Sequence, residues 1–292
     1  MSVSPSSPAS SASPPSPGSP GTSPSPSSSG AAPIPSLTPS AVVTRLRAAG
    51  CVFAEDEARL LVGAARDAAE LDAMVRRRVL GQPLEHVLGW AEFRGLRIAV
   101  DVGVFVPRRR TEFLVRQAAA LAGPGAVVVD LCCGSGALGA ALGAAVGRIE
   151  LHAADIDPVA VRCARGNLAG VGGRVYEGDL YDPLPDALLG RVDVLLANVP
   201  YVPTEEVGLL PAEARDHEAR VALDGGADGL DVLRRVTADA ARWLAPGGRL
   251  LFETSERQVP YALEAVAAGG LVPRSVSDEE MYATVVIGTR RA

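Results

Sequence analysis

The chain has 292 residues, 48% of them hydrophobic, and a formal net charge of −6. This length allows one large domain or two smaller ones with a sizeable core. The acidic balance argues against a protein held to nucleic acid mainly by phosphate contacts. No apolar run reaches the ~18 residues that span a membrane, and the N-terminus lacks the basic and apolar regions of a secretory signal. We therefore expect a cytoplasmic protein without a membrane partner.

The cysteines predict neither a metal site nor a disulfide. No two of the four have the C-x2-C spacing of metal ligands, and the adjacent pair Cys132 and Cys133 is a poor disulfide pair. We expect buried free thiols in a reducing compartment, and no metal.

Composition and periodicity divide the chain into four segments. Residues 1–36 are nearly all Ser, Pro, Ala and Gly, which predicts a disordered tail. Residues 37–88 carry helical patterns and predict a small helical domain. Residues 89–110 alternate apolar and polar positions around two glycines, as a β-hairpin linker would. Residues 111–292 alternate strand-like and helical patterns and predict a second domain.

The second domain is predicted to have an α/β fold. Apolar strands separated by helices are typical of a mostly parallel, doubly wound sheet, which binds ligands at the carboxyl ends of its strands. The expected helices of the chain are 40–49, 55–68, 69–80, 157–169 and 230–244, and the expected strands are 126–131, 148–154, 173–177, 192–197, 248–253 and 282–289.

A glycine turn follows the first of these strands, in "VVVDLCCGSGALG". Gly134 and Gly136 allow the backbone to pass close to a ligand, and the N-terminus of the next helix offers free N–H groups. A turn of this kind also occurs in α/β proteins that bind no ligand there, so the turn alone is a weak signal.

An acidic residue lies at the end of each of the first three strands: Asp130, Asp155 and Asp179. Asp155, about 20 residues past the glycine turn, is placed to accept hydrogen bonds from ribose hydroxyls. The alternative role for such an acid is a helix cap, which is most plausible for Asp157 before Pro158. Since the turn is not a full G-x-G-x-x-G, the set favours S-adenosylmethionine over a dinucleotide.

The fourth strand ends in Asn198-Val199-Pro200-Tyr201. An Asn side chain and the next backbone carbonyl can together accept both hydrogens of a planar –NH2 group. This favours a pyramidal nitrogen whose lone pair faces a methyl donor, so that orientation and electrostatics replace a strong base. Tyr201 can stack on the planar group. The alternative is a capped strand end with a core tyrosine.

Several motifs occur in the order typical of one enzyme family: "QPLEHVLGWAEFRGL", "VFVPRRRTEFLV", "DLCCGSGALG", "ADIDPVAVRCARGN", "NVPY", "HEARVALDGGADGLDVLRRV" and "LAPGGRLLFETSERQ". From about residue 38 onward the chain resembles the HemK/PrmC family of protein N5-glutamine methyltransferases. The resemblance implies a helical substrate-recognition domain, a hairpin linker and a Rossmann-like class I methyltransferase domain. It also implies methylation of a glutamine, usually in the Gly-Gly-Gln loop of peptide chain release factors.

The resemblance also implies the site residues. Asn198 and the backbone of Val199 and Pro200 are expected to hold the glutamine amide, with Tyr201 beside it and Phe105 over its other face. Together with the strand-end pattern, it predicts S-adenosylmethionine contacts at Asp130, Cys132, Cys133, Gly134, Ser135, Gly136, Asp155, Ile156, Asp179, Leu180 and Asn198.

Three positions depart from the family pattern. Val199 replaces a proline; its carbonyl remains, but the turn is less rigid. Cys132 replaces a glycine, which is unstrained only if its φ angle is negative. Arg109-Arg110 replace Pro-Glu near the expected substrate path, which bears on substrate identity more than on the reaction.

Two other functions fit parts of the pattern. A nucleic-acid amino-methyltransferase would use the same Asn-x-Pro-Tyr geometry, although such enzymes also need a basic surface and a pocket for a flipped base. A non-catalytic binding protein of the same fold would explain Val199 as a lesion. His217 is tempting as a general base, but the amide chemistry requires none, and a structural role is expected.

Overall fold

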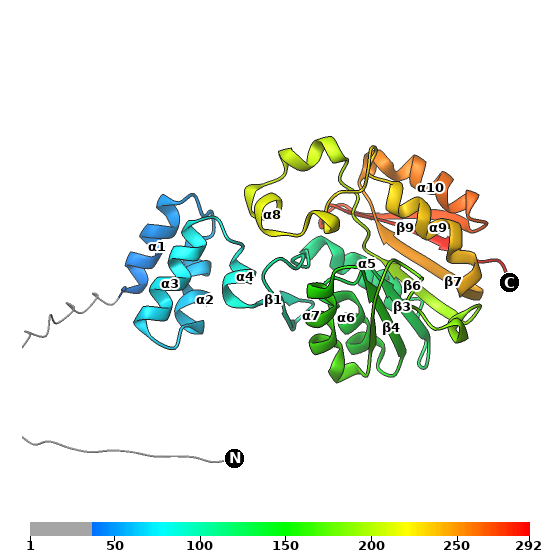
Figure 1. The fold of residues 1–292 in the computed structure, drawn as a ribbon, viewed down its shortest axis with the longest axis horizontal. Coiled ribbons are helices and arrows are strands. Elements are labelled where there is room, and N and C mark those ends of the chain that lie inside the picture. The colour runs from blue at the N-terminus through cyan, green and yellow to red at the C-terminus, as the bar shows by residue number, and fades with distance from the viewer. Residues whose placement is uncertain (1–36) are drawn as a thin grey trace, which may run out of the picture. The chain divides into compact units, whose positions relative to one another are not determined.

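The computed structural model describes residues 37–292. The predicted disordered tail, 1–36, lies outside the described residues. The described chain begins with helices, continues through a short hairpin and ends in an α/β sheet (Figure 1).

Helices α1, α2 and α3 form the N-terminal bundle, as predicted from the sequence. The Thr38 hydroxyl accepts a hydrogen bond from the backbone of Ala41, and Pro39 occupies the first turn, so both start signals act as expected. Asp67 caps the third helix in the same way, at 2.8 Å from the Glu70 N–H. The bundle helices and the short helix after them are α1 (Pro39–Ala48), α2 (Ala54–Ala64), α3 (Ala68–Val79) and α4 (Leu84–Leu88).

The predicted hairpin is shorter than expected. Strands β1 (Trp90–Phe93) and β2 (Leu96–Ala99) pair antiparallel through a two-residue turn. Both turn residues, Arg94 and Gly95, have positive φ angles, as a tight hairpin turn requires. Residues 100–108, which the predicted hairpin over residues 89–110 included, form no strand and lead into the short 3-10 helix η1 (Arg109–Thr111).

Residues 127–289 contain a seven-stranded sheet, in the order β5-β4-β3-β6-β7-β9-β8. In this order, neighbouring strands from β5 to β7 pair parallel, and β9 pairs antiparallel with both β7 and β8. The expected mostly parallel sheet is therefore confirmed. The strands are β3 (Val127–Leu131), β4 (Glu150–Asp155), β5 (Arg174–Glu177), β6 (Val192–Ala197), β7 (Leu244–Glu253), β8 (Val272–Asp278) and β9 (Ala283–Thr289).

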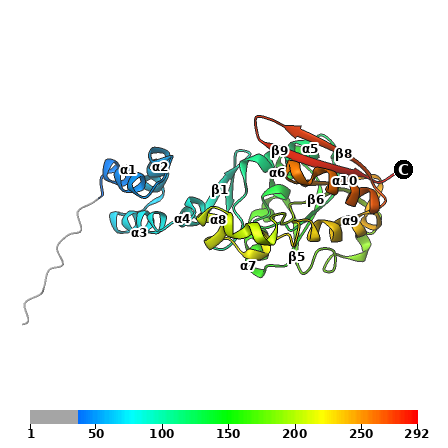
Figure 2. The ribbon, with the colours of Figure 1, turned by 90° about the horizontal axis from the view of Figure 1, so that it is seen from above.

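Strand β8 was missed by the sequence patterns. It lies at the edge of the sheet beside β9, as the two long strands at the red end of the chain show in Figure 2. Most of its side chains are exposed or half-buried, and it contains Pro273. An edge strand of this kind lacks the buried alternation that identifies other strands.

Helices cover both faces of the sheet and bury two apolar clusters. Residues of α5, α6 and α7 pack in the first cluster, and residues of α9 and α10 pack in the second. These helices are α5 (Glu112–Ala119), α6 (Ala137–Val146), α7 (Pro158–Leu168), α9 (Asp231–Trp243) and α10 (Val259–Ala268).

The strand order reverses between β3 and β6. The chain runs outward from β3 through β4 to β5, and then returns to the other side of β3 with β6. In open α/β sheets, ligands bind at the carboxyl ends of the strands at this switch point. The glycine turn after β3 and the Asn198 turn after β6 therefore meet at one place.

Two further features bear on the sequence predictions. All four cysteines, including the adjacent Cys132 and Cys133, are free thiols. In the part of the chain that the structure describes, no helix combines the length and the apolar character needed to cross a membrane.

Candidate active site

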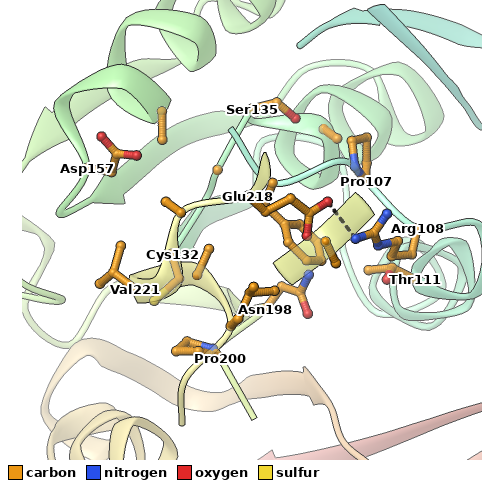
Figure 3. A pocket seen from close by; sticks show the side chains of 18 of the residues that line it. Pro107, Arg108, Thr111, Cys132, Ser135, Asp157, Asn198, Pro200, Glu218 and Val221 are labelled. Atoms are coloured by element: carbon orange, nitrogen blue, oxygen red, sulfur yellow. Dashed lines mark hydrogen bonds and ion pairs between the residues drawn. The ribbon is translucent and has the colours of Figure 1, made fainter. Parts of the chain in front are cut away.

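A cavity of about 420 Å³ opens at the switch point (Figure 3). This volume lies in the usual range for small-molecule sites. Its walls come from the turns after β3, β4 and β6, from residues 103–111 and from residues 210–223. It brings together these predicted site residues: Phe105, Cys132, Cys133, Gly134, Ser135, Asp155, Ile156, Asn198, Val199, Pro200 and Tyr201.

The glycine turn after β3 passes through three residues with positive φ. Gly134 and Gly136 have φ of 55° and 77°, and Cys132 has φ of 53°. The condition of a negative φ at Cys132 is therefore not met, and the residue carries backbone strain of about 1 kcal/mol or more. Hydrogen bonds from Cys133 to the Ala154 carbonyl and from Gly136 to Cys133 hold this conformation. Gly136 does not line the cavity.

Asp155 joins the ends of β3 and β4. Its Oδ2 accepts a hydrogen bond from the Gly134 N–H at 2.8 Å, and its Oδ1 accepts one from the Asp157 N–H at 2.9 Å. Burial raises the pKa of this carboxyl group. Each oxygen keeps a second lone pair that a hydroxyl could use. Asp157 caps helix α7 through the Val159 N–H, so the helix-cap role expected of it is confirmed.

Besides Gly136, three predicted cofactor residues lie away from the cavity lining. Asp130 is fully buried behind the glycine turn, and its Oδ2 accepts from the Gly139 N–H at 3.0 Å. Burial raises the Asp130 pKa to about 7. Asp179 forms an ion pair with Arg235 at 2.7 Å, and Leu180 is buried in the second apolar cluster.

The Asn198 turn begins where β6 ends. Asn198 is half-buried and lines the cavity, whereas Val199 packs in the apolar core. Pro200 and Tyr201 complete the turn, and all four residues border the cavity. Asn198 thus lines the same cavity as the glycine turn.

Tyr201 is held at its hydroxyl and at its backbone. The hydroxyl donates to Glu253 Oε1 at 3.0 Å, and the Arg110 guanidinium donates both to the hydroxyl and to Glu253. Gln258 donates to the Tyr201 carbonyl at 3.0 Å. Burial, and then the charge of Glu253, raise the pKa of the Tyr201 phenol, so the hydroxyl stays protonated.

Two glycines outside the cavity support this turn. A Cβ on Gly225 would lie 2.6 Å from the Pro200 carbonyl oxygen, and one on Gly229 would collide with the Tyr201 carbonyl oxygen. The segment "LDGGADGLD" therefore packs its backbone directly against the Asn198 turn. The glycines are visible in the sequence, but their contacts with Pro200 and Tyr201 are visible only in the structure.

Glu218 is a cavity residue that the sequence analysis did not single out. A bridge to Gly103 brings it beside the entry segment, where it accepts hydrogen bonds from the Val106 N–H and the Arg108 guanidinium. Burial raises its pKa, and its Oε2 has no partner among the described residues. Arg108 also lies over the Phe105 ring, 4.8 Å from its centre.

His217, considered above as a base, does not line the cavity. No signal in the sequence marks Glu218, rather than its neighbour His217, as the residue that lines the cavity. Within residues 37–292, no three His, Cys, Asp or Glu side chains are arranged to hold a metal ion.

The residues at the switch point fit S-adenosylmethionine. A ribose needs acceptors, which Asp155 offers through its remaining lone pairs. An adenine needs an apolar wall, and Ile156 is half exposed at the cavity. The space where a Gly134 Cβ would stand is open, so a ligand can approach the backbone there.

Fold and sequence comparisons agree with this arrangement. Residues 96–226 match the family described as Methyltransferase small domain. A crystal structure of a methyltransferase from Pyrococcus furiosus aligns with 68% of this chain and 90% of that chain, with a TM-score of 0.52 at 16% identity, which shows the shared fold. The fold and the site define a class I S-adenosylmethionine-dependent methyltransferase.

The chain is also 38% identical over 214 residues to the release factor glutamine methyltransferase of Streptomyces coelicolor, covering 72% of each protein. It belongs to the release factor glutamine methyltransferase family, as its motifs indicated.

A second relative has a different named substrate. The 4-amino-L-phenylalanine/4-methylamino-L-phenylalanine methyltransferase of Streptomyces pristinaespiralis is 38% identical over 194 residues, which are 63% of this chain and 65% of the relative. Similarity at this level therefore extends to an enzyme that is named for an amino-acid amine.

Proposed function

We propose that this enzyme transfers a methyl group to the side-chain nitrogen of a glutamine in a peptide chain release factor, in its Gly-Gly-Gln loop. The observation that carries the proposal is the Asn198–Tyr201 turn, which lies at the switch point and lines the same cavity as the glycine turn. The Streptomyces coelicolor relative, which is named for this activity, supports the choice of substrate.

The turn would bind the substrate amide by its two N–H bonds. Asn198 Oδ1 accepts one hydrogen, and the backbone carbonyl of Val199 or Pro200 accepts the other. Both acceptors draw the nitrogen out of conjugation with its carbonyl, so its lone pair turns toward the cofactor side of the cavity. Tyr201 and Phe105 would cover the two faces of the planar amide. The reaction then depends on orientation, without a dedicated general base.

The cofactor would occupy the glycine-turn side of the cavity. When bound, S-adenosylmethionine supplies an electrophilic methyl group on its sulfonium sulfur. Asp155 would accept the ribose hydroxyls, Ile156 would contact the adenine, and the backbone of Cys132–Ser135 would line the remainder. Asp130 and Gly136 would act from behind by shaping the turn, whereas contacts from Asp179 and Leu180 stay predictions.

The helical segment 37–88 would recognise the protein substrate. The bundle exposes large apolar side chains, among them Val52 (83% exposed) and Phe53 (69% exposed), beside the start of α2. Contiguous exposed apolar side chains mark protein-binding surfaces, and Val52 and Phe53 are adjacent in the chain. We further propose that residues 89–110 link this domain to the catalytic domain 111–292. We place the reaction in the cytoplasm, where release factors act, and expect no stable complex with nucleic acid.

A second candidate substrate is the aromatic amine of an amino acid. The observation that favours it is the similarity to the 4-amino-L-phenylalanine methyltransferase. An arylamine resembles a carboxamide, because its nitrogen lone pair is also delocalised and it also offers two N–H bonds. Asn198 and the following carbonyl could bind either group.

The deciding experiment is methyl transfer from labelled S-adenosylmethionine. A purified release factor, the same factor with its loop glutamine changed to alanine, 4-amino-L-phenylalanine, and total RNA and DNA would each be offered as acceptors. We expect label on the wild-type factor alone. Label on the amino acid or on nucleic acid, with none on the factor, would overturn the proposal in favour of that acceptor.

A further inference from the structure

We propose that Arg110 is a positioning residue for the reaction: it fixes the Tyr201 hydroxyl against Glu253 and so stiffens the turn that carries Asn198. The inference rests on the proposed function, since it assigns a role in holding the amide substrate. Arg110 and Arg108 both line the cavity, but Arg110 bonds to different partners.

The contacts of Arg110 form a closed triangle. Its Nε donates to Glu253 Oε1 at 2.8 Å, one Nη donates to the Tyr201 hydroxyl, and that hydroxyl donates to the same Glu253 oxygen at 3.0 Å. The three residues come from η1, from the end of β7 and from the turn after β6. One guanidinium therefore ties together segments that are far apart in the sequence.

The burial of Glu253 makes the ion pair with Arg110 energetically important. The Glu253 side chain is only 4% exposed, and its Oε2 has no hydrogen-bond partner among the described residues. Arg110 is its one ion-pair partner within residues 37–292. A buried carboxylate without its cation is costly, so the pair is strongly held. The Tyr201 hydroxyl is bonded to both Arg110 and Glu253, so the ion pair fixes its position.

The backbone of the turn is bonded to Gln258 at Tyr201 and to Leu223 at Val202, at the end away from Val199. Within the described chain, the Val199 N–H makes no hydrogen bond to another backbone group outside helices and strands. Unlike a proline, Val199 does not lock its own φ angle in a ring, although Pro200 after it favours an extended conformation. Arg110 itself lines the cavity with 47% of its side chain exposed, so it holds Tyr201 from the substrate side.

A purely electrostatic role is the competing explanation. In that case Arg110 only neutralises Glu253, and any cation at this position would serve. Arg110→Lys separates the two roles, because lysine keeps the charge but lacks the planar fork that bonds two partners at fixed angles. Arg109→Lys is the matched control, since Arg109 is exposed, does not line the cavity and has no ion pair among the described residues.

The first measurement is steady-state methylation of the release factor by these variants. We expect Arg110→Lys to lower kcat about tenfold, the loss typical of one hydrogen bond to a charged group, with cofactor Kd within about twofold of the wild type. Arg109→Lys should match the wild type. A kcat for Arg110→Lys within about twofold of the wild type would overturn the inference.

A second variant tests whether the turn is the element that Arg110 controls. Val199→Pro fixes a φ angle in the turn and removes an N–H that has no backbone partner. Added to Arg110→Lys, it should recover several-fold of the lost kcat. An unchanged or lower kcat in the double variant would count against the stiffening role.

Hydrogen exchange gives a readout that needs no substrate. Peptides covering residues 198–206 should exchange faster in Arg110→Lys than in the wild type or Arg109→Lys. If the wild type labels no glutamine, the proposed function fails, while exchange still decides the role of Arg110. If the glutamine is labelled but exchange is equal in all three proteins, only the Arg110 inference fails.

Discussion

Asn198 and Asp155 lie on one cavity but are expected to serve different partners. Asn198 follows β6 and presents an amide oxygen, whereas Asp155 follows β4 and holds the glycine turn through two backbone N–H groups. Because the proposed roles differ, measuring cofactor binding and turnover independently separates the two residues.

Substitution of each by alanine should affect a different constant. Asn198→Ala should lower kcat at least about 100-fold, because the amide loses an acceptor aimed at its N–H, and should leave cofactor Kd nearly unchanged. Asp155→Ala should weaken cofactor binding about tenfold or more. Titration calorimetry with S-adenosylmethionine and single-turnover labelling measure the two effects. Near-normal turnover by Asn198→Ala would disprove the amide-binding role.

Asp130 predicts a dependence of stability on pH. Its pKa is raised by burial from 3.8 to about 7, so between these values the folded protein binds a proton that the unfolded chain has lost. Stability from this group is therefore highest at low pH and falls as pH rises toward about 7. Between pH 5 and pH 8 we expect the wild type to lose about 2 kcal/mol more than Asp130→Asn. Urea unfolding of both proteins at the two pH values measures the difference; equal slopes would rule out a proton on Asp130.

At the scale of elements, the site depends on how one loop supports another. The turn after β6 is bonded to residues 223–225, where the Val202 N–H donates to Leu223 and the Gly225 N–H donates to Val202. The glycines of that segment allow the two backbones to lie in contact. A side chain in this interface should disturb the site without touching the cavity.

Gly229→Ala tests this contact. Its φ of 78° is unfavourable for alanine, and the new Cβ would collide with the Tyr201 carbonyl. Gly270→Ala is the control, because its φ of 80° is similar but no atom lies within 4 Å of the added Cβ. We expect Gly229→Ala to be about 2 kcal/mol less stable than Gly270→Ala, and to lose activity as well. Equal thermal stability of the two variants would show that the contact is not tight.

Across the whole described chain, Arg78 connects the bundle to the catalytic domain. Its guanidinium is buried, bonded to Glu57 of α2 at 2.6 Å and to Glu213 of helix α8 (Ala212–His217) at 2.6 Å. Arg78 is the last of three consecutive arginines in the final turn of α3. The structure shows that one member of the run is part of a buried ion-pair network.

Removal of this arginine should destabilise the protein strongly. Arg78→Ala leaves the buried Glu57 without its cation, at an expected cost of about 3–5 kcal/mol. Arg59→Ala removes a solvent-exposed pair with Asp56 and should cost less than about 1 kcal/mol. Chemical denaturation of both variants makes the comparison. A loss below about 1 kcal/mol for Arg78→Ala would show that the network contributes little.

Local patterns predicted most of the fold. The three bundle helices and six of the sheet strands lie within a few residues of their predicted bounds, because each has its own cap, glycine stop or apolar run. The patterns missed β8, where solvent exposure removes the alternation that distinguishes a strand. Over residues 100–108 they predicted a strand that does not form: the alternating side chains of Val100, Val104 and Val106 are buried in an apolar cluster without strand pairing. The strained φ of Cys132 was also not predicted, since it is imposed by hydrogen bonds to β4.

The sequence by itself determined the class of fold, the ends of six strands to within a few residues and the family, because strand periodicity, glycine turns and motif order are local properties of the chain. Only the tertiary structure decided which of those residues share a cavity. It placed Asp130, Gly136, Asp179 and Leu180 outside the lining, brought Glu218 to the site, and paired Arg110 with Glu253 there. The physical reason is that a buried charge needs a partner of opposite charge, and the partner is chosen by packing between segments more than 100 residues apart.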